Sequence, residues 1–292
     1  MSLALTNTLA WVVVSAFALS ALLATRDDEH PARVAAAAAW TVFAVFWALL
    51  IDHFLFTQNS FIEGVLSALA VPLSLYAAYL VLTDRPTLVR LSRAIAVMGI
   101  IYLPFQTIPA LTEAAITITA ESTYALITLV GYNPQFITDP YPSAVVFIHD
   151  GHTITTNILL ACSGIGSIAI VSGLIAATTA PIRRRLTGIA LVVPLIYALN
   201  VIRVSFIAIA FGNQWFQWTR PLITLLYAPL QSDPRVSYLF ADKILAQSLS
   251  VVALVLITLA LLRILPELAA LLDDALYVAT KTDYNLEDHF TR

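Results

Sequence analysis

Residues 157–167 read NILLACSGIGS and contain Cys162, the only cysteine of the chain. The apolar run Ile165–Ala177 overlaps its end, and the small residues Ser163 and Gly164 suit the start of a helix. A thiolate, the nucleophilic form of cysteine, is stabilised at a helix N-terminus or beside cationic side chains. A lone cysteine in an apolar chain can equally be a small hydrophobic residue that fills space. The stretch therefore predicts either a reactive thiol at the mouth of a helix or a packing residue.

The composition of the whole chain is that of an integral membrane protein. Hydrophobic residues make up 60% of the 292 residues, charged residues make up 11%, and the mean hydropathy is +0.86. A soluble domain carries about 25% charged residues. A single cysteine excludes a disulfide within the chain and a cysteine-rich metal site. The first apolar run has no basic segment before it and is followed by RDDEHPAR at residues 26–33, so we expect a membrane span rather than a signal peptide.

Seven apolar runs are long enough to cross about 30 Å of hydrocarbon. They lie at Leu5–Thr25, Val34–Phe56, Ile62–Leu82, Ala94–Ala110, Ile165–Ala180, Leu186–Phe211 and Tyr238–Leu262. The segment Leu111–Gly131 has the length of an eighth span, but Glu113, Glu121 and its threonines favour an amphipathic or re-entrant helix. We therefore expect an all-α polytopic membrane protein with about seven helices across the membrane, or eight if residues 111–131 also cross.

The basic residues predict how these spans are oriented, because short loops rich in Lys and Arg stay in the cytoplasm. They fall in the first, third and fifth connections, at Arg26 and Arg33, at Arg85, Arg90 and Arg93, and at Arg183, Arg184 and Arg185. No Lys or Arg occurs in residues 1–6, 57–61 or 111–161. We expect the N-terminus outside and the C-terminus in the cytoplasm, with residues 1–265 as one membrane domain and residues 266–292 as an acidic cytoplasmic tail.

The outer segment before the cysteine contains the one convincing β pattern. Residues 143–160 read SAVVFIHDGHTITTNILL, in which β-branched and aromatic residues flank Asp150 and Gly151. An Asp-Gly pair suits the tight turn of a hairpin. We expect a small extracellular β-hairpin that leads into the cysteine and holds it at the outer membrane surface. His149 and His152 are interpreted as solvated loop residues, since no third metal ligand is evident.

Two arginines mark the outer ends of the last two predicted spans, and a charge within a span indicates function by default. Arg203 lies in the outer half of the sixth span, and Asn200, three residues earlier, lies on the same helix face. Arg235 stands at the start of the seventh span. Taken singly, each arginine could instead be a surface residue whose side chain reaches the outer lipid headgroups. The topology nevertheless places both at the membrane face of Cys162, where two guanidiniums would stabilise a thiolate and a tetrahedral oxyanion.

Three sequence blocks in this region resemble the signature blocks of the exosortase/archaeosortase family of membrane cysteine transpeptidases. They are ACSGIGS around Cys162, NVIRV around Arg203 and RVSYLFADKIL starting at Arg235. The resemblance covers residues 150–249, whereas the first four spans are similar only in being hydrophobic. In most of that family the third block begins with histidine, and the arginine found here resembles the archaeosortase A branch.

The resemblance implies an enzyme that recognises exported surface proteins, such as S-layer glycoproteins, by a C-terminal signal of three parts. These parts are a short Pro-Gly-Phe type motif, a membrane helix and a basic cluster. The resemblance further implies that the signal is cleaved off and that the new C-terminus is transferred to a membrane phospholipid, with the active site at the extracellular face. No cofactor, metal or nucleic acid is expected.

The chemistry of such an enzyme can be assigned to residues of this sequence. Cys162 would attack the substrate carbonyl and form a thioester. Arginine is not deprotonated in proteins, so Arg203 and Arg235 would act as electrostatic and positioning groups, which leaves the proton carrier unidentified. We expect nearby polar residues to support these three, namely Ser163, Asn200, Asp233, Tyr238 and Asp242.

Two other classes of protein stay open as alternatives. A retinal-binding seven-helix protein would attach retinal to a lysine in mid-membrane, whereas Lys243 lies close to the outer boundary of its span. A polytopic transporter with a structural cysteine would usually show internal repeats and charges near the midplane. Intramembrane zinc proteases need an HExxH helix, and serine proteases need a paired histidine; both patterns are absent.

Overall fold

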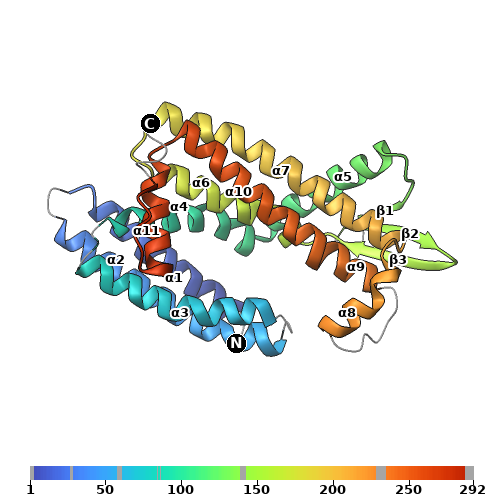
Figure 1. Cartoon of the computed structure of the whole chain (residues 1–292), viewed down its shortest axis with the longest axis horizontal. Coiled ribbons are helices and arrows are strands. Elements are labelled where there is room, and N and C mark those ends of the chain that lie inside the picture. Colours follow the sequence, from blue (N-terminus) through green and yellow to red (C-terminus); the bar gives the residue numbers. More distant parts are fainter. Residues whose placement is uncertain are drawn as a thin grey trace. The chain divides into compact units, whose positions relative to one another are not determined.

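The computed structural model describes residues 3–26, 29–57, 61–83, 85, 87–138, 143–227 and 235–286. The chain divides into two compact units. The first unit comprises residues 1–103, 169–190 and 261–292, and the second comprises residues 104–168 and 191–260. Figure 1 labels the helices and strands that build them.

The first unit is built around long apolar helices. They are α1 (Leu3–Leu23), α2 (His30–Asp52), which continues as the π-helical segment η1 (His53–Thr57), α3 (Phe61–Leu82) and α4 (Leu88–Thr107). Phe17 and Trp40 meet edge to face, with ring centroids 5.3 Å apart, and small residues such as Ala36 allow the backbones to approach. The indole Nε1 of Trp40 donates a hydrogen bond to Ser92 Oγ (3.0 Å), so this buried polar group has a partner.

Helix α11 (Leu268–Thr280) belongs to the first unit and packs beside α3. Arg85 Nη1 pairs with Asp274 Oδ1 (3.3 Å), and Thr87 Oγ1 donates to the same oxygen (2.9 Å). The Arg85 guanidinium also lies 3.6 Å from the ring centroid of Tyr277. The predicted tail, residues 266–292, therefore contains a packed helix. Its cytoplasmic location and its separation from residues 1–265 stay predictions.

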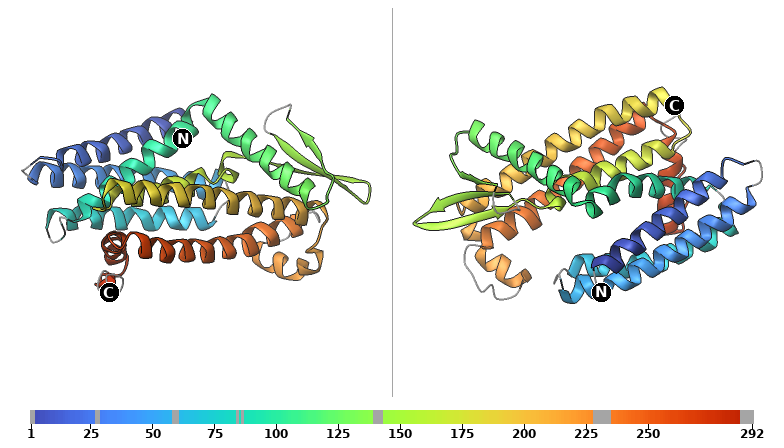
Figure 2. Two further views of the ribbon diagram at one scale, coloured as in Figure 1. Left: turned by 90° about the horizontal axis from the view of Figure 1, so that it is seen from above. Right: turned by 180° about the vertical axis from the view of Figure 1, so that it is seen from behind.

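The second unit contains the sheet and the cysteine. The chain leaves α4 and forms α5 (Pro109–Leu129), β1 (Gln135–Ile137), β2 (Ala144–His149), β3 (His152–Asn157) and the 3-10 turn η2 (Leu160–Cys162). It continues through the start of α6 (Ile165–Ala177), the later part of α7 (Ile182–Gly212), the 3-10 turn η3 (Gln217–Thr219) and α8 (Arg220–Tyr227). Residues 169–177 of α6 and 182–190 of α7 belong to the first unit. It then runs on as α9 (Arg235–Leu239), the π-helical segment η4 (Phe240–Ala246) and α10 (Gln247–Ile264). Figure 2 shows α5 and the sheet at the same end of this unit.

The three strands form one antiparallel sheet in the order β1-β2-β3. His149 pairs with His152 at the end of the β2–β3 register. Asp150 and Gly151 close the turn with φ angles of 49° and 77°, the left-handed conformation that a two-residue hairpin turn requires and that an Asp-Gly pair tolerates. The predicted hairpin and its turn are confirmed, whereas β1 was not predicted.

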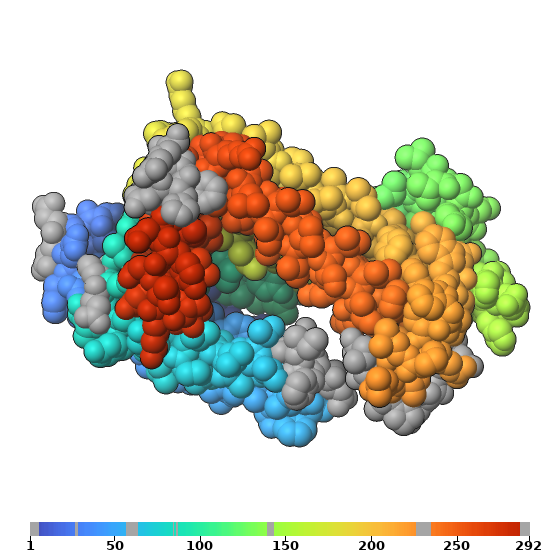
Figure 3. Space-filling view, in the orientation of Figure 1, coloured from blue at the N-terminus to red at the C-terminus, as the bar shows by residue number. Residues whose placement is uncertain are grey.

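The hairpin is fixed to the helices of its own unit. Val145 and Phe147 of β2 are buried against Ile127 of α5 and against Ala208 of α7. Gly212, at the end of α7, faces the Phe147 ring so closely that no Cβ would fit there. In Figure 3 the side chains of the hairpin (lime) and of α8 (orange) lie at one end of the second unit. The segment that leads from β3 to the cysteine therefore starts from a rigid support.

Six helices within the described residues are long and apolar enough to cross a membrane. They run at Thr6–Leu23, His30–Phe56, Gly64–Leu82, Leu88–Thr107, Ile182–Gly212 and Arg235–Ile264, and they match six of the seven predicted spans. The remaining predicted span, Ile165–Ala180, is α6, whose 13 residues cover about 20 Å. The eighth candidate, residues 111–131, is the 21-residue helix α5, which is not among the six. The helical polytopic fold with a small sheet is confirmed, while the number of spans and the outer location of the sheet stay predictions.

Candidate active site

Cys162 ends the 3-10 turn η2, three residues before α6 begins at Ile165. The backbone N–H of Cys162 donates to Leu159 O (2.8 Å), and that of Ser163 donates to Leu160 O (3.0 Å). Ser163 is buried; its hydroxyl donates to Leu160 O (2.7 Å) and accepts from the N–H of Ile165 (3.3 Å). Ser163 thus fixes the turn that presents the thiol, and α6 begins where the sequence predicted.

The backbone next to the cysteine requires glycine. Gly164 has a φ of +76°, and an added Cβ would lie 3.1 Å from Asn200 Cγ. Asn200 projects from α7 and donates from Nδ2 to the carbonyl oxygen of Cys162 (2.5 Å). Because Arg203 follows Asn200 by about one helical turn, this bond ties the turn that carries the thiol to the helix that carries the arginine. The predicted supporting residue Asn200 therefore holds the cysteine backbone rather than the thiol.

The thiol is partly exposed and rests on an apolar surface. Cys162 packs against a buried cluster that includes Ile116, Ala120, Ile158 and Val204. Two of these residues come from α5, whose contribution sequence reasoning missed, although apolar and small residues at a spacing of four, as at Ile116 and Ala120, could have indicated a packed face. Cys162 also lies three residues before α6, whose first N–H groups have no partners within the helix.

Arg203 pairs with a carboxylate of the seventh predicted span. Its Nη2 donates to Asp242 Oδ1 (2.7 Å), and Lys243 Nζ lies 3.5 Å from Asp242 Oδ2. The Asp242 side chain is 10% exposed and that of Arg203 is 29% exposed. The Nε of Arg203 is buried and has no hydrogen-bond partner among the described residues. Arg203 is therefore an oriented, largely buried group with a free donor.

Tyr238 joins the cysteine to this ion pair. Its side chain lies close enough to Asp242, Cys162 and Arg203 to interact electrostatically with all three. Tyr238 lies in α9, and Asp242 lies four residues later in the π-helical segment η4. Such segments are rare and frequently occur at functional sites. The structure thus brings Cys162, Asn200, Arg203, Tyr238 and Asp242 together.

Arg235 lies at the edge of this group. It begins α9, is exposed and precedes Tyr238 by three residues, so the two are neighbours on the helix surface. Asp242, which the sequence predicted as a supporting residue, pairs with Arg203 and Lys243. Asp233, another predicted supporting residue, lies outside the described residues.

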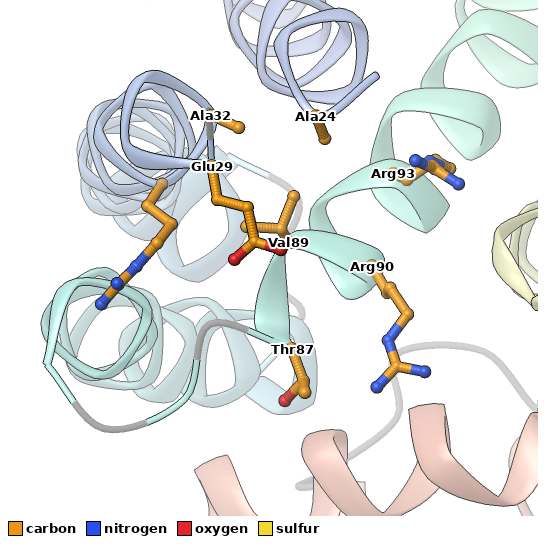
Figure 4. A pocket seen from close by; sticks show the side chains of 8 residues that line it. Ala24, Glu29, Ala32, Thr87, Val89, Arg90 and Arg93 are labelled. Carbon is orange, nitrogen blue, oxygen red and sulfur yellow. The ribbon is translucent and has the colours of Figure 1, made fainter. Parts of the chain in front are cut away.

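A groove of about 240 Å³ adjoins the site and begins at Gly164, Asn200 and Arg203. The first unit contains a separate pocket of about 320 Å³ (Figure 4), to which Glu29, Arg90 and Arg93 contribute charged side chains. None of the predicted site residues lines that pocket. Within the part of the chain that the structure describes, no three His, Cys, Asp or Glu side chains form a group that could hold a metal ion.

A partly exposed thiol at a helix mouth and an arginine paired with an aspartate, in a polytopic protein, point to a membrane enzyme, and comparison with known proteins identifies its family. The family described as Transmembrane exosortase (Exosortase_EpsH) matches residues 6–230, which include Cys162 and Arg203. The chain therefore belongs to the transmembrane exosortase family and is a multi-pass membrane protein of the sorting transpeptidase type.

Two curated proteins named Archaeosortase A match nearly the whole chain. The one from Haloferax volcanii is 43% identical over 297 residues, which covers 97% of this chain and 97% of the relative. The one from Natronomonas pharaonis is 39% identical over 282 residues, which covers 94% of this chain and 89% of the relative. The similarity thus extends into the first four spans, which were expected to match only in hydrophobicity. These matches favour a processing transpeptidase over a transporter or a retinal protein. No solved structure matches the chain.

Proposed function

We propose that this protein cleaves the C-terminal sorting signal of exported surface proteins, S-layer glycoproteins among them, and transfers the new C-terminus to a membrane phospholipid. The signal would consist of a Pro-Gly-Phe type motif, a membrane helix and a basic cluster. The observation that carries the proposal is the convergence of Cys162, Arg203, Tyr238 and Asp242 in a chain 43% identical to an Archaeosortase A. The proposal includes no cofactor, metal or nucleic acid.

In the first step, the Cys162 thiolate attacks the carbonyl carbon of the scissile peptide bond. The resulting oxyanion collapses, the C–N bond breaks, and the amine leaves with a proton, so that a thioester joins Sγ to the new C-terminus. Arg203 stabilises the oxyanion, because its partly exposed guanidinium has more N–H donors than the one that pairs with Asp242 and is always charged.

In the second step, an O–H or N–H group of the lipid headgroup attacks the thioester carbonyl. The C–S bond breaks, and the proton of the nucleophile restores the thiol. Tyr238 and Asp242 are our candidates for the proton carrier that the sequence left unidentified. The tyrosine side chain lies within electrostatic reach of both the Asp242 carboxylate and Cys162.

Arg235 would act from the surface of the site. Because it is exposed and is about one turn away from Tyr238, we assign it to electrostatic positioning of the incoming peptide rather than to proton transfer.

The proposed orientation places the N-terminus outside, the C-terminus in the cytoplasm and Cys162 at the extracellular face, where exported proteins arrive. Its support is the positions of the basic residues. In a cysteine-free variant, a single cysteine at Thr138 should react with an impermeant thiol reagent in intact cells, and one at Arg184 should not. The reverse labelling pattern would place Cys162 in the cytoplasm and contradict the proposal.

The decisive experiment compares the intact mass of a surface protein from cells that carry wild-type or variant enzyme. Wild type should remove the C-terminal helix and add the mass of a lipid, whereas Cys162→Ala and Cys162→Ser should do neither while remaining inserted and abundant. Thr258→Ala, an equally small change on an exposed face of α10, is the control and should process normally. Processing by the Cys162→Ala variant would contradict the assignment of Cys162 as the nucleophile. An unprocessed substrate in wild-type cells would contradict the proposed function.

A further inference from the structure

The groove beside the site lies within the second unit, between α7 and α10, which run alongside each other there (Figures 1 and 2). Its polar end is formed by Asn200 and Arg203 of α7 and Gln247 of α10. Its other end is apolar and includes Ile196 and Ile257. The groove therefore leads from the catalytic arginine into a hydrocarbon-like environment.

The dimensions of the groove limit what it can hold. It extends along α7 from Ile196 to Arg203 and along α10 from Gln247 to Ile257, which corresponds to about 10–15 Å. A volume of about 240 Å³ over that length gives a cross-section of roughly 20 Å². An α-helix with its side chains is about 10 Å across, which corresponds to roughly 80 Å². The groove is therefore too narrow for a transmembrane helix and has the width of a single hydrocarbon chain.

The charges at the polar end favour an anion. Arg203 is the charged residue that lines the groove, and its neighbours outside the lining, Asp242 and Lys243, add one negative and one positive charge. A guanidinium has five N–H donors, and Asp242 takes up one of those of Arg203, whose side chain is 29% exposed. A phosphate group at this end would find both a net positive charge and free donors.

We propose that this groove is the binding site for one hydrocarbon chain of the phospholipid acceptor, with the lipid phosphate next to Arg203. This inference rests on the proposed function, because it assigns a place to the second substrate of the same site. The lipid enters sideways from the bilayer between α7 and α10, where Ser250 and Leu254 are exposed. Its headgroup nucleophile then reaches the thioester, because Gly164, two residues after Cys162, also lines the groove.

Ala253 lines the middle of the groove, and a larger side chain there should block it. We would incubate the purified full-length enzyme in vesicles that contain a phospholipid with a diazirine in one chain, and map the photo-cross-links. Wild type should cross-link within residues 196–203 or 247–257. Ala253→Phe and Ser250→Trp should each lower the cross-linking yield about tenfold, because the groove cannot hold both a large side chain and a lipid chain. Val252→Phe, on the exposed neighbouring face of α10, is the matched control and should cross-link like wild type.

The same variants are then given substrate, and cleavage and lipid transfer are measured separately. Ala253→Phe should still cleave but should accumulate the Cys162 thioester, or its hydrolysis product, in place of the lipid-linked product. Unchanged cross-linking in both groove variants would overturn the inference. Loss of cleavage with intact lipid cross-linking would also overturn it, since the groove would then serve the peptide substrate. A third outcome is that the lipid cross-links only in the groove while the product carries no lipid. This outcome would overturn the proposed function but support a lipid-binding groove.

Discussion

Both units of this protein contain an arginine–aspartate pair, and the two pairs differ in how many partners the arginine contacts. In the first unit, Arg85 contacts Asp274 and Asp283 and lies over the ring of Tyr277. In the second unit, Arg203 contacts Asp242, and its buried Nε has no partner among the described residues. An arginine with two carboxylate partners and an aromatic ring beneath it holds helices together, whereas an arginine inside a span with a buried unpaired donor is costly and indicates function.

Changing Arg203 should have the largest effect. Arg203→Lys should lower processing by about 100-fold or more, close to the effect of Arg203→Ala, because a flexible ammonium cannot reproduce a planar group with several donors. The intact mass of a surface protein, sampled over time, measures this rate. Arg85→Lys is the matched control and should process at nearly the wild-type rate. Restoration of most activity by Arg203→Lys would mean that only general positive charge is needed.

Asp242→Asn should come next, with processing lowered about tenfold or more, because it leaves Arg203 buried without a counter-ion. The double variant Arg203→Asp, Asp242→Arg restores an ion pair but moves the guanidinium to the other helix. It should recover thermal stability without recovering processing. Fluorescence-detected chromatography of heated samples measures the stability. Recovery of both stability and processing would show that the Arg203–Asp242 pair, like the Arg85–Asp274 pair, only holds helices together.

The exposed Arg235 should matter less than Arg203. Arg235→His should retain partial activity that rises as the pH falls below about 6.5, because imidazole is charged only in that range. Processing by purified enzyme, measured across pH and compared with Arg235→Ala, tests this expectation. The alanine variant should show no such rise. Best activity of the histidine variant near neutrality would indicate a proton relay at this position instead.

The smallest effect is expected at the first pair. Asp274→Asn removes one of several partners of a partly exposed Arg85 and should cost about 1–2 kcal/mol of stability. The thermal midpoint of the purified protein should fall slightly, and the processing rate should stay that of wild type. A processing defect without loss of stability would show that the first unit also takes part in catalysis.

Much of the second unit could be predicted from local sequence. Asp150 and Gly151 predicted the hairpin turn, because few residue pairs adopt its left-handed φ angles. Ser163 and Gly164 predicted where α6 begins, because small residues suit the start of a helix. Apolar run lengths predicted seven long helices; six of them are present, and the seventh, α6, has only 13 residues. These features depend on residues close together in the chain.

Other features were decided by tertiary structure alone. The sequence named Asp242 and Tyr238 as supporting residues, but only the packing of α7 against the α9–η4 segment selected Arg203 as the partner of Asp242 and brought Tyr238 near the thiol. The α5 surface beneath Cys162 and the groove along α10 likewise arise from how helices distant in sequence are rotated and spaced. The sequence by itself determined where the candidate thiol, guanidiniums and carboxylates lie along the helices, because residue type and helical period are local properties. Which side chains meet was left to the tertiary structure, because a π-helical turn or a small rotation of an apolar helix changes every facing pair without altering the hydrophobic pattern.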